Sequence, residues 1–462
     1  MIVRIVGEGQ WEVPESELGD LNVIDAKVEK AVDAADQSAL TAALTELVNR
    51  VRTHGEPVSE ATVTDSDLII PDISSTIDEI TVWLDENVSR DGLIPGWPVR
   101  VLVVTDGWGQ LSSATVGTAL GRAWSQLDAQ VAVVPVGVCG AGFSQAWADA
   151  HHARLEHVVV SGSALVGDEV VGDGGQTTPA RAPSSRSSCG EADALSGNDI
   201  DVTVARAAGQ VLIRPELPDL GQRRWNESSA VLANVVDGLT SPDEHIVLEL
   251  GQVPWRDGGR GAVEAGDSWL KRTTLVVNSR AAETQLTGLR GVVSTEGRAE
   301  LMDADEMLRR DRELCEWAGE LTDDDSSGQT PGAGAAGGLG MAVMARGGRV
   351  CTGTALLMEH AHAAATMDAA DLVVTGCTEL NFGTMGGEVV TTVTQLAAGH
   401  MVPVIVVAGS VTASSRELRQ TGIEDAQALF EGEVLDPEAQ LVAVDPQWIT
   451  ARTLPVARTW CW

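Results

Sequence analysis

The stretch DLVVTGCTELNFGTMGGEVV, residues 371–390, decides the fold class because it joins a buried-looking strand to a helix through a glycine-rich turn. The apolar run 372–374 ends in Thr375-Gly376, and three further glycines precede an apolar helix start. Parallel sheets present ligands in this way, at the carboxyl ends of their strands. The turn has the form of a phosphate-handling loop, yet it carries Glu379 and Glu388 and no cation.

The same alternation of strand and helix recurs over most of the chain. Near-continuous apolar runs predict strands buried on both faces of a parallel sheet, with amphipathic runs between them predicting helices. The predicted strands are 99–104, 130–136, 245–250, 275–277, 371–375 and 404–408, and the predicted helices are 114–124, 143–150, 230–237 and 304–319. The polar stretch 167–199 is expected to be a loop or insertion. The sequence therefore predicts an α/β protein.

Length and charge restrict the classes of protein that this chain can belong to. At 462 residues and 44% hydrophobic residues, it is long enough for two or three globular domains. A net charge of -36 disfavours nucleic acid and anionic lipid surfaces as direct partners, since both are bound by neutralising phosphates. No apolar run reaches the ~18 to 20 residues of a spanning helix, and the first residues lack the pattern of a signal peptide. We expect a cytoplasmic protein without direct membrane insertion.

Cysteine and lysine usage bear on the chemistry that is available. The six cysteines include no C-x-x-C pair, which argues against a disulfide scaffold or a zinc site, and we expect no metal ligand set. His360 and His362 lie two residues apart on a predicted helix, so they point in different directions. Lysine is confined to Lys27, Lys30 and Lys271, which leaves few ammonium groups to hold a phosphate.

The first 96 residues read as a self-contained α+β unit, with a short strand, a helical hairpin and a third helix. The segments MIVRIVGEGQ, LNVIDAKVEKAV, LVNRVRTHGEP, DLIIPD and GLIPG resemble the PspA-associated domain of bacterial envelope-stress systems. The resemblance covers residues 1–96 and rests on apolar and turn positions. It implies a PspA-type coiled-coil protein as partner and a regulatory setting, and it implies no reaction.

Residues 99–430 resemble the glycerate kinase family, whose two α/β lobes bind ATP and glycerate in the cleft between them. The resemblance rests on the order of four segments: VRVLVVTDGWGQLSSA, PVGVCGAG, HIVLELGQVPWRDGGRGAVEA and GAGAAGGLG. It implies a glycerate-kinase-like module with a parallel, Rossmann-like sheet behind the α+β domain. The predicted domains are 1–96, a Rossmann-type lobe of 97–165 plus 330–430, a second lobe of 166–329, and a C-terminal extension of 431–462.

The resemblance fails at most of the charged positions that the family uses. Gly109 stands where a lysine is expected, Val138 and Ala141 replace two acidic residues, and Arg256 replaces an asparagine. In the turn 375–388 the family's Glu, Arg, Asp and Lys correspond, in that order, to Cys377, Glu379, Asn381 and Glu388. Two expected cations are therefore anions.

The retained positions provide the candidate site. Asp106 and Asp257 each follow a predicted strand and are the candidate catalytic residues, although an aspartate there is often a helix cap. The resemblance places eight further residues in the nucleotide and substrate cleft: Gly258, Gly259, Gly334, Gly337, Gly338, Thr375, Gly376 and Asn381. The glycines of GAGAAGGLG fit either an anion site at a helix N-terminus or close helix–sheet packing, and packing is favoured. Cys377 has no nearby base, so it is interpreted as a neutral packing residue.

Two hypotheses for function follow. Phosphoryl transfer depends on cations at the polyphosphate, carboxylates that hold Mg²⁺ and a base for the substrate hydroxyl, and each lost charged contact removes ~2 to 4 kcal/mol of transition-state stabilisation. The favoured hypothesis is a PspA-associated regulatory or scaffolding protein with an inactive kinase-like domain, in which a small molecule still occupies the cleft. The alternative is an active ATP-dependent glycerate kinase acting on D-glycerate, with ATP and Mg²⁺, in which Asp106, Asp257 and arginines compensate.

Overall fold

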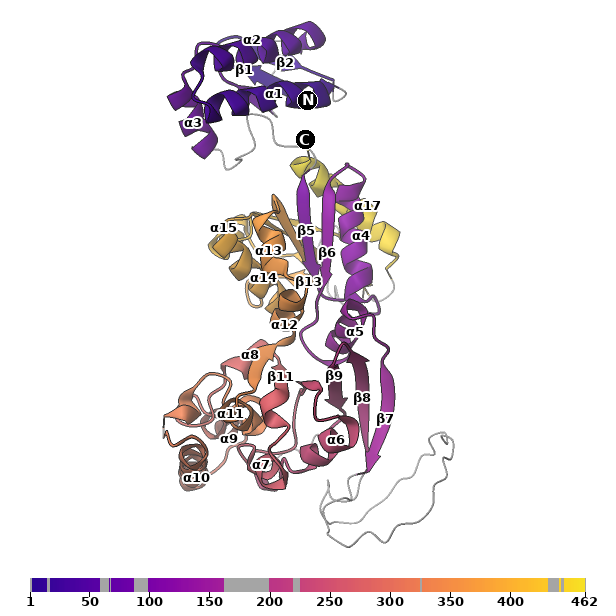
Figure 1. Cartoon of the computed structure of the whole chain (residues 1–462), viewed down its shortest axis with the longest axis vertical. Coiled ribbons are helices and arrows are strands. Elements are labelled where there is room, and N and C mark those ends of the chain that lie inside the picture. The colour runs from indigo at the N-terminus through magenta and orange to yellow at the C-terminus, as the bar shows by residue number, and fades with distance from the viewer. Residues whose placement is uncertain are drawn as a thin grey trace.

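The computed structural model describes residues 2–14, 17–58, 66, 68–86, 99–161, 199–218, 225–324, 326–430, 440–441 and 444–461. The described strands form three sheets of four, five and six strands. Figure 1 shows the N-terminal unit, in indigo, drawn apart from the two larger sheets. The predicted loop 167–199 lies outside the described residues except for its last residue. Within the described part of the chain, no helix has both the length and the apolar character required to cross a bilayer.

The N-terminal unit combines a four-stranded sheet with three helices, of which the sequence predicts the helices and the first strand. Its sheet has the order β3-β2-β1-β4, in which β1 pairs antiparallel with β2 and parallel with β4. The elements are β1 (Ile2–Ile5), β2 (Gly9–Glu12), α1 (Leu18–Asp33), α2 (Gln37–His54), β3 (Glu56–Pro57), β4 (Leu68–Ile70) and α3 (Ile77–Glu86). Asp36 caps α2 by accepting from two backbone N–H groups at 3.0 Å. Leu21, Leu44 and Leu47 are fully buried in the core between helices and sheet.

The five-stranded lobe contains a wholly parallel sheet of order β15-β14-β13-β5-β6. Its strands are β5 (Arg100–Thr105), β6 (Gln130–Pro135), β13 (Leu372–Leu380), β14 (Val404–Val411) and β15 (Asp425–Ala428). The associated helices are α4 (Ser113–Ser125), α5 (Gly140–Ala150), α13 (Ala363–Asp368), α14 (Gly387–His400), α15 (Ser415–Gln420) and α17 (Pro446–Trp460). Figure 1 shows α17, in yellow, beside α4, and the Thr450 hydroxyl donates to the Ala119 carbonyl at 2.7 Å. The C-terminal residues thus help to form this lobe's core.

The six-stranded lobe is mixed. Its order is β12-β11-β10-β9-β8-β7; the four strands from β9 to β12 are parallel, whereas β7 and β8 run antiparallel. The strands are β7 (Glu156–Ser161), β8 (Asp199–Ala207), β9 (Gln210–Pro215), β10 (His245–Glu249), β11 (Thr273–Val277) and β12 (Arg349–Thr352). The other elements are α6 (Val231–Leu239), α7 (Arg260–Ala265), η3 (Leu270–Arg272), α8 (Ser279–Glu283), α9 (Val292–Ala299), α10 (Ala304–Thr322), η4 (Ser327–Gln329), η5 (Ala335–Gly338), α11 (Leu339–Ala345) and α12 (Gly353–His360).

Strand pairing places the lobe boundaries elsewhere than the sequence predicts. Residues 156–161 and 349–352 were assigned to the Rossmann-type lobe, but they form β7 and β12 of the six-stranded sheet. Pairing between distant strands depends on tertiary packing and leaves no local trace in the sequence. One continuous core also spans both lobes, since Val104 and Phe143 cluster with Leu212 and Val276, all fully buried. The lobes are therefore packed firmly against each other.

Two glycine-rich turns lock together inside the six-stranded lobe. The N–H of Gly258 donates to the Gly337 carbonyl at 3.1 Å, and the Trp255 indole N–H donates to the Ala336 carbonyl at 3.0 Å. A Cβ on Gly338 would lie 2.5 Å from the Gly258 Cα, which real side chains do not tolerate. The glycines of GAGAAGGLG are thus required for close packing, which agrees with the favoured interpretation.

Gly259→Ala should destabilise the protein more than Gly209→Ala. Both glycines have φ near +76°, at 76° and 77° respectively, so an alanine at either site meets a similar left-handed penalty of about 1 to 2 kcal/mol. Only at Gly259 would the new Cβ also lie 2.8 Å from the Cβ of Ala342, whereas Gly209 has open space around it. The overlap should add about 1 to 3 kcal/mol to the loss. Free energies of unfolding from urea titration test this, and equal losses in the two variants would contradict it.

Candidate functional site

The carboxyl ends of the parallel strands in both lobes meet at one edge, which we call the inter-lobe edge. Asp106 follows β5, and Glu388 lies in the first turn of α14, which follows β13. Glu249 ends β10 in the other lobe. These three residues form the carboxylate cluster. The topology therefore brings together acidic side chains that are up to 282 residues apart in the sequence, Asp106 and Glu388.

Two carboxylates of the cluster accept hydrogen bonds across the edge. Glu388 accepts from the backbone N–H of Ser279, at the start of α8, at 2.5 Å and from the Thr354 hydroxyl, in α12, at 3.3 Å. Glu249 accepts from the N–H of Gly140, at the start of α5, at 3.0 Å. Helix N-termini carry unpaired N–H groups and partial positive charge, so they stabilise carboxylates. These contacts link elements of the two lobes at the position where the glycerate kinase resemblance expects a cation.

The cluster is electrostatically unfavourable for further negative charge. Burial raises the pKa of Asp106, and the charge of Glu388 raises it further, against the lowering effect of the Gly107 N–H. Burial also raises the pKa of Glu249, whereas the Gly140 N–H and Arg214 lower it. For Cys139, burial is again the main cause of a raised pKa, and all three carboxylates of the cluster add to the shift. The charges that raise the pKa of this thiol are those of Glu249, Glu388 and Asp106, and Arg214 is a cation beside the cluster, 3.8 Å from Glu249.

The strand within the stretch 371–390 runs further than the sequence predicts. β13 continues to Leu380, so Thr375 and Gly376 lie inside the strand and are buried. A Cβ on Gly376 would lie 2.5 Å from the Trp108 ring, so packing requires this glycine. The turn begins at Asn381, whose Oδ1 accepts from the Thr384 N–H at 2.9 Å. The placement of Thr375 and Gly376 in a ligand turn is thus wrong, because the neighbouring strands β5 and β14 extend β13 beyond its apolar run.

Asp257 lies within the six-stranded lobe and has a structural role there. Its carboxylate accepts from the N–H and hydroxyl of Ser229, both at 2.8 Å, and from the N–H groups of Gly259 and Gly261, both at 3.0 Å. These bonds tie the start of α7 to the segment before α6. Together with a longer contact from the Ser228 hydroxyl at 3.5 Å, these bonds agree with the capping interpretation. Arg256 beside it pairs with Glu296 at 2.7 Å.

The five predicted cleft glycines are buried in the interlocked turns. These are Gly258, Gly259, Gly334, Gly337 and Gly338. A Cβ at any of them would lie 3.0 Å or less from a neighbouring atom, so packing requires glycine at these positions. Of the predicted residues, only Asp106 joins the carboxylate cluster.

Glu249 is the residue of this edge that the sequence analysis missed. It is 2% exposed, and among the described residues its Oε2 has no hydrogen-bond partner, with Arg214 Nε 3.8 Å away. A charged residue at the end of the apolar run HIVLE is the signal that could have identified it. Cys377 is buried, and burial raises its pKa to about 12, so it is a neutral packing residue, as predicted.

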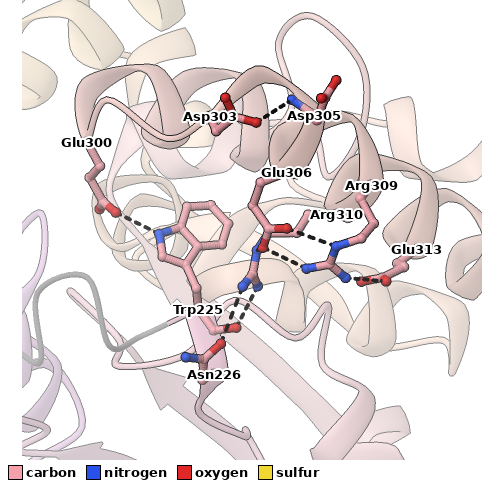
Figure 2. Close-up of polar contacts among 9 residues, drawn as sticks. All are labelled: Trp225, Asn226, Glu300, Asp303, Asp305, Glu306, Arg309, Arg310 and Glu313. Carbon is pink, nitrogen blue, oxygen red and sulfur yellow. Dashed lines mark hydrogen bonds and ion pairs between the residues drawn. The ribbon is translucent and has the colours of Figure 1, made fainter.

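A second charged cluster, on the acidic helix α10, is a structural network. Figure 2 shows Glu306 bonded to both Arg309 and Arg310, and the Arg310 guanidinium reaching the Trp225 carbonyl at 2.8 Å. The hydrogen bonds from Arg309 are the main reason that the pKa of Glu306 falls to about 2. This acidic helix thus also anchors the segment at Trp225. Among the described residues, no group of three or more His, Cys, Asp or Glu side chains is arranged to hold a metal ion.

These features define a two-lobed α/β module behind a small α+β domain. Residues 1–96 match the family model for PspA-Associated protein, and residues 266–461 match that of the glycerate kinase family. The chain therefore joins a PspA-associated domain to a glycerate kinase family domain.

Individual relatives agree with this assignment. The chain is 32% identical over 206 residues to an uncharacterized protein of Mycobacterium bovis, an alignment covering 43% of this chain and 54% of the relative. The chain thus spans about half of that protein's length. It is 26% identical over 260 residues to a glycerate kinase of Bacillus cereus, covering 49% of this chain and 67% of the relative. A solved structure of a protein assigned as glycerate kinase 2 from Salmonella typhimurium LT2 has a similar fold, with a TM-score of 0.55 at 19% identity, over 78% of this chain and 98% of that one.

Asp106→Asn should stabilise the protein at pH 7. A carboxyl whose pKa is raised in the folded state favours its protonated form there, so its ionisation reduces stability as pH rises through the folded pKa. Asparagine keeps an oxygen that can accept from the Gly107 N–H and adds no charge. The melting temperature should rise at pH 7, and the gain should shrink as pH falls towards the ordinary pKa of aspartate. Glu379→Gln, which removes an exposed charge from the same lobe, is the matched control; a loss of stability at pH 7 in Asp106→Asn would contradict the expectation.

Proposed function

We propose that this chain is a regulatory or scaffolding protein of bacterial envelope stress, in which the PspA-associated domain recruits a PspA-type coiled-coil partner and the glycerate-kinase-like module transfers no phosphate. The charge of the inter-lobe edge is the observation that carries the second half of this proposal. A kinase needs cations beside the transferred phosphate. Here Glu388 replaces the expected lysine, and the cluster around Cys139 is wholly acidic.

ATP and Mg²⁺, which the family implies, do not fit this arrangement of residues. A nucleotide triphosphate at the edge would approach Asp106, Glu249 and Glu388 and be repelled by them. The carboxylates are also unsuited to hold Mg²⁺, since Glu388 is already bonded to the start of α8, and Glu249 is buried and bonded to Gly140. No phosphoryl-transfer step is therefore assigned to these side chains.

The alternative, an active D-glycerate kinase, is favoured by one observation. Asp106 is retained at the end of β5, and its raised pKa suits a general base. The 26% identity to a glycerate kinase of Bacillus cereus also supports this alternative. The Glu388 carboxylate, at the position of the expected lysine, still favours the regulatory function.

Purified full-length protein should show no turnover with Mg-ATP and D-glycerate and no rise in melting temperature with Mg-ATP. Binding to the native state at a hundredfold excess over Kd would stabilise it by about 2.7 kcal/mol, so binding is readily detected. The Bacillus cereus glycerate kinase serves as the positive control in a coupled assay of ADP release. Turnover that Asp106→Asn removes would overturn the proposal.

An exposed apolar group on the N-terminal unit supports recruitment of a partner. Ile69 lies on β4, the edge strand of the sheet, and is 40% exposed, and Val6 is 46% exposed. The N–H of Val6 donates to the carbonyl of Ile70, the neighbour of Ile69, at 2.9 Å, so Val6, which follows β1, lies beside this edge strand. An edge strand with apolar side chains is a suitable surface for a partner.

Ile69→Asp in the full chain should abolish co-purification with a PspA-type coiled-coil protein. The charge would enter an apolar contact and lose solvation there. Val23→Asp, at an exposed valine of α1, is the matched control and should leave co-purification unchanged. Recovery of the coiled-coil protein should be compared after both variants are shown to melt like the unmodified chain. Equal recovery with Ile69→Asp and with the unmodified chain would contradict the assignment of this edge.

A further inference from the structure

The parallel strands of the six-stranded lobe end at the acidic inter-lobe edge. The first residues of these strands line a pocket that carries cationic and imidazole side chains. This pocket has a volume of about 290 Å³. It is bounded by the first residues of β9, β10, β11 and β12, by η3 and by the last turn of α12. The β10 strand has His245 at this end and Glu249 at the other, so about 13 Å separates the pocket from the carboxylate cluster. The two are distinct sites.

The pocket concentrates side chains that bind anions. Lys271, the only lysine outside the N-terminal unit, is exposed at its rim and has no ion pair in the described structure. Arg349 projects from β12 and pairs with Glu359 at 2.8 Å. His245 and His360 complete the set, and the Nδ1 of His360 has no hydrogen-bond partner in the part of the chain that the structure describes. In a chain with a net charge of -36, this gathering of cationic and imidazole groups is exceptional.

We propose that this pocket binds a small organic molecule carrying a compact oxyanion, either a phosphate or a carboxylate group. The ammonium of Lys271 and the guanidinium of Arg349 supply charge for the anion, and the imidazoles of His245 and His360 supply N–H donors. The volume lies near the lower end of the range for small-molecule sites, which suits a metabolite rather than a polymer. Glu359 is the one carboxylate that lines the pocket, and it competes with the ligand for Arg349.

The two histidines make the site sensitive to pH. Burial lowers the pKa of His245, and Arg349 and Arg272 lower it further. Burial also lowers the pKa of His360, with His151, Arg349 and His245 acting in the same direction and Glu359 opposing them. A bound anion would favour the protonated imidazoles, so binding should take up protons. An anion of constant charge should therefore bind more tightly as pH falls.

Isothermal calorimetry on the full-length chain, with inorganic phosphate, citrate and sulfate as probes, tests the proposal. At least one probe should bind saturably, and a preference for phosphate or for citrate would identify the class of ligand. Lys271→Ala should weaken binding about tenfold, the effect of losing one charge-assisted hydrogen bond of about 1.4 kcal/mol. Lys30→Ala removes the same charge from an exposed position on α1 and should have no effect.

A variant that should bind the probe more tightly keeps the proposal testable even if Lys271→Ala misfolds. Glu359→Gln removes the competing carboxylate and should tighten binding of the same probe. Sulfate, whose charge is constant between pH 6 and pH 8, should bind more tightly at pH 6. Absence of saturable binding by all three probes would overturn the proposal. So would equal weakening by Lys271→Ala and Lys30→Ala, weaker binding by Glu359→Gln, or a sulfate affinity independent of pH.

Discussion

The contacts between carboxylates and helix N-termini at the inter-lobe edge are the interaction on which the arrangement of the two lobes depends. Glu388 of α14 accepts from the start of α8, and Glu249 of β10 accepts from the start of α5. Each bond joins elements of the two sheets. Because both sheets direct the carboxyl ends of their parallel strands to this edge, helix N-termini from both lobes meet there as well. Carboxylates accept hydrogen bonds from the unpaired N–H groups of such termini.

The same contacts also determine which groups face the helix N-termini at the inter-lobe edge. In a phosphate-binding site, the N–H groups of helix N-termini face an anionic ligand. In this chain the protein's own carboxylates take that place at α8 and α5, so the positive ends of the helices are neutralised internally. The cost is a local excess of negative charge, which appears in the raised pKa values of Asp106, Glu249 and Cys139. Glu388, at the position where the family resemblance expects a lysine, thus forms a contact between the lobes.

The two ends of the six-stranded sheet differ in charge, and the same elements connect them. β10 has Glu249 at one end and His245 at the other, and α12 begins near Thr354, which bonds Glu388, and ends at His360. One end is acidic and closed by hydrogen bonds, whereas the other is a pocket with Lys271 and Arg349. A ligand-binding role for the module therefore does not require the family's own site.

The sequence by itself determined the fold class, the order of the main strands and helices, and the loss of expected cations, because these depend on local periodicity and on residue identity. It also favoured packing over anion binding for the glycines of GAGAAGGLG, and the close contacts of Gly337 and Gly338 agree. Only the tertiary structure decided which candidates meet. Thr375 proved to be a strand residue and Asp257 a local cap, whereas Glu249 joined Asp106 and Glu388. The physical reason is that strand pairing and the burial of charge arise from contacts between residues far apart in the sequence, which no local pattern encodes.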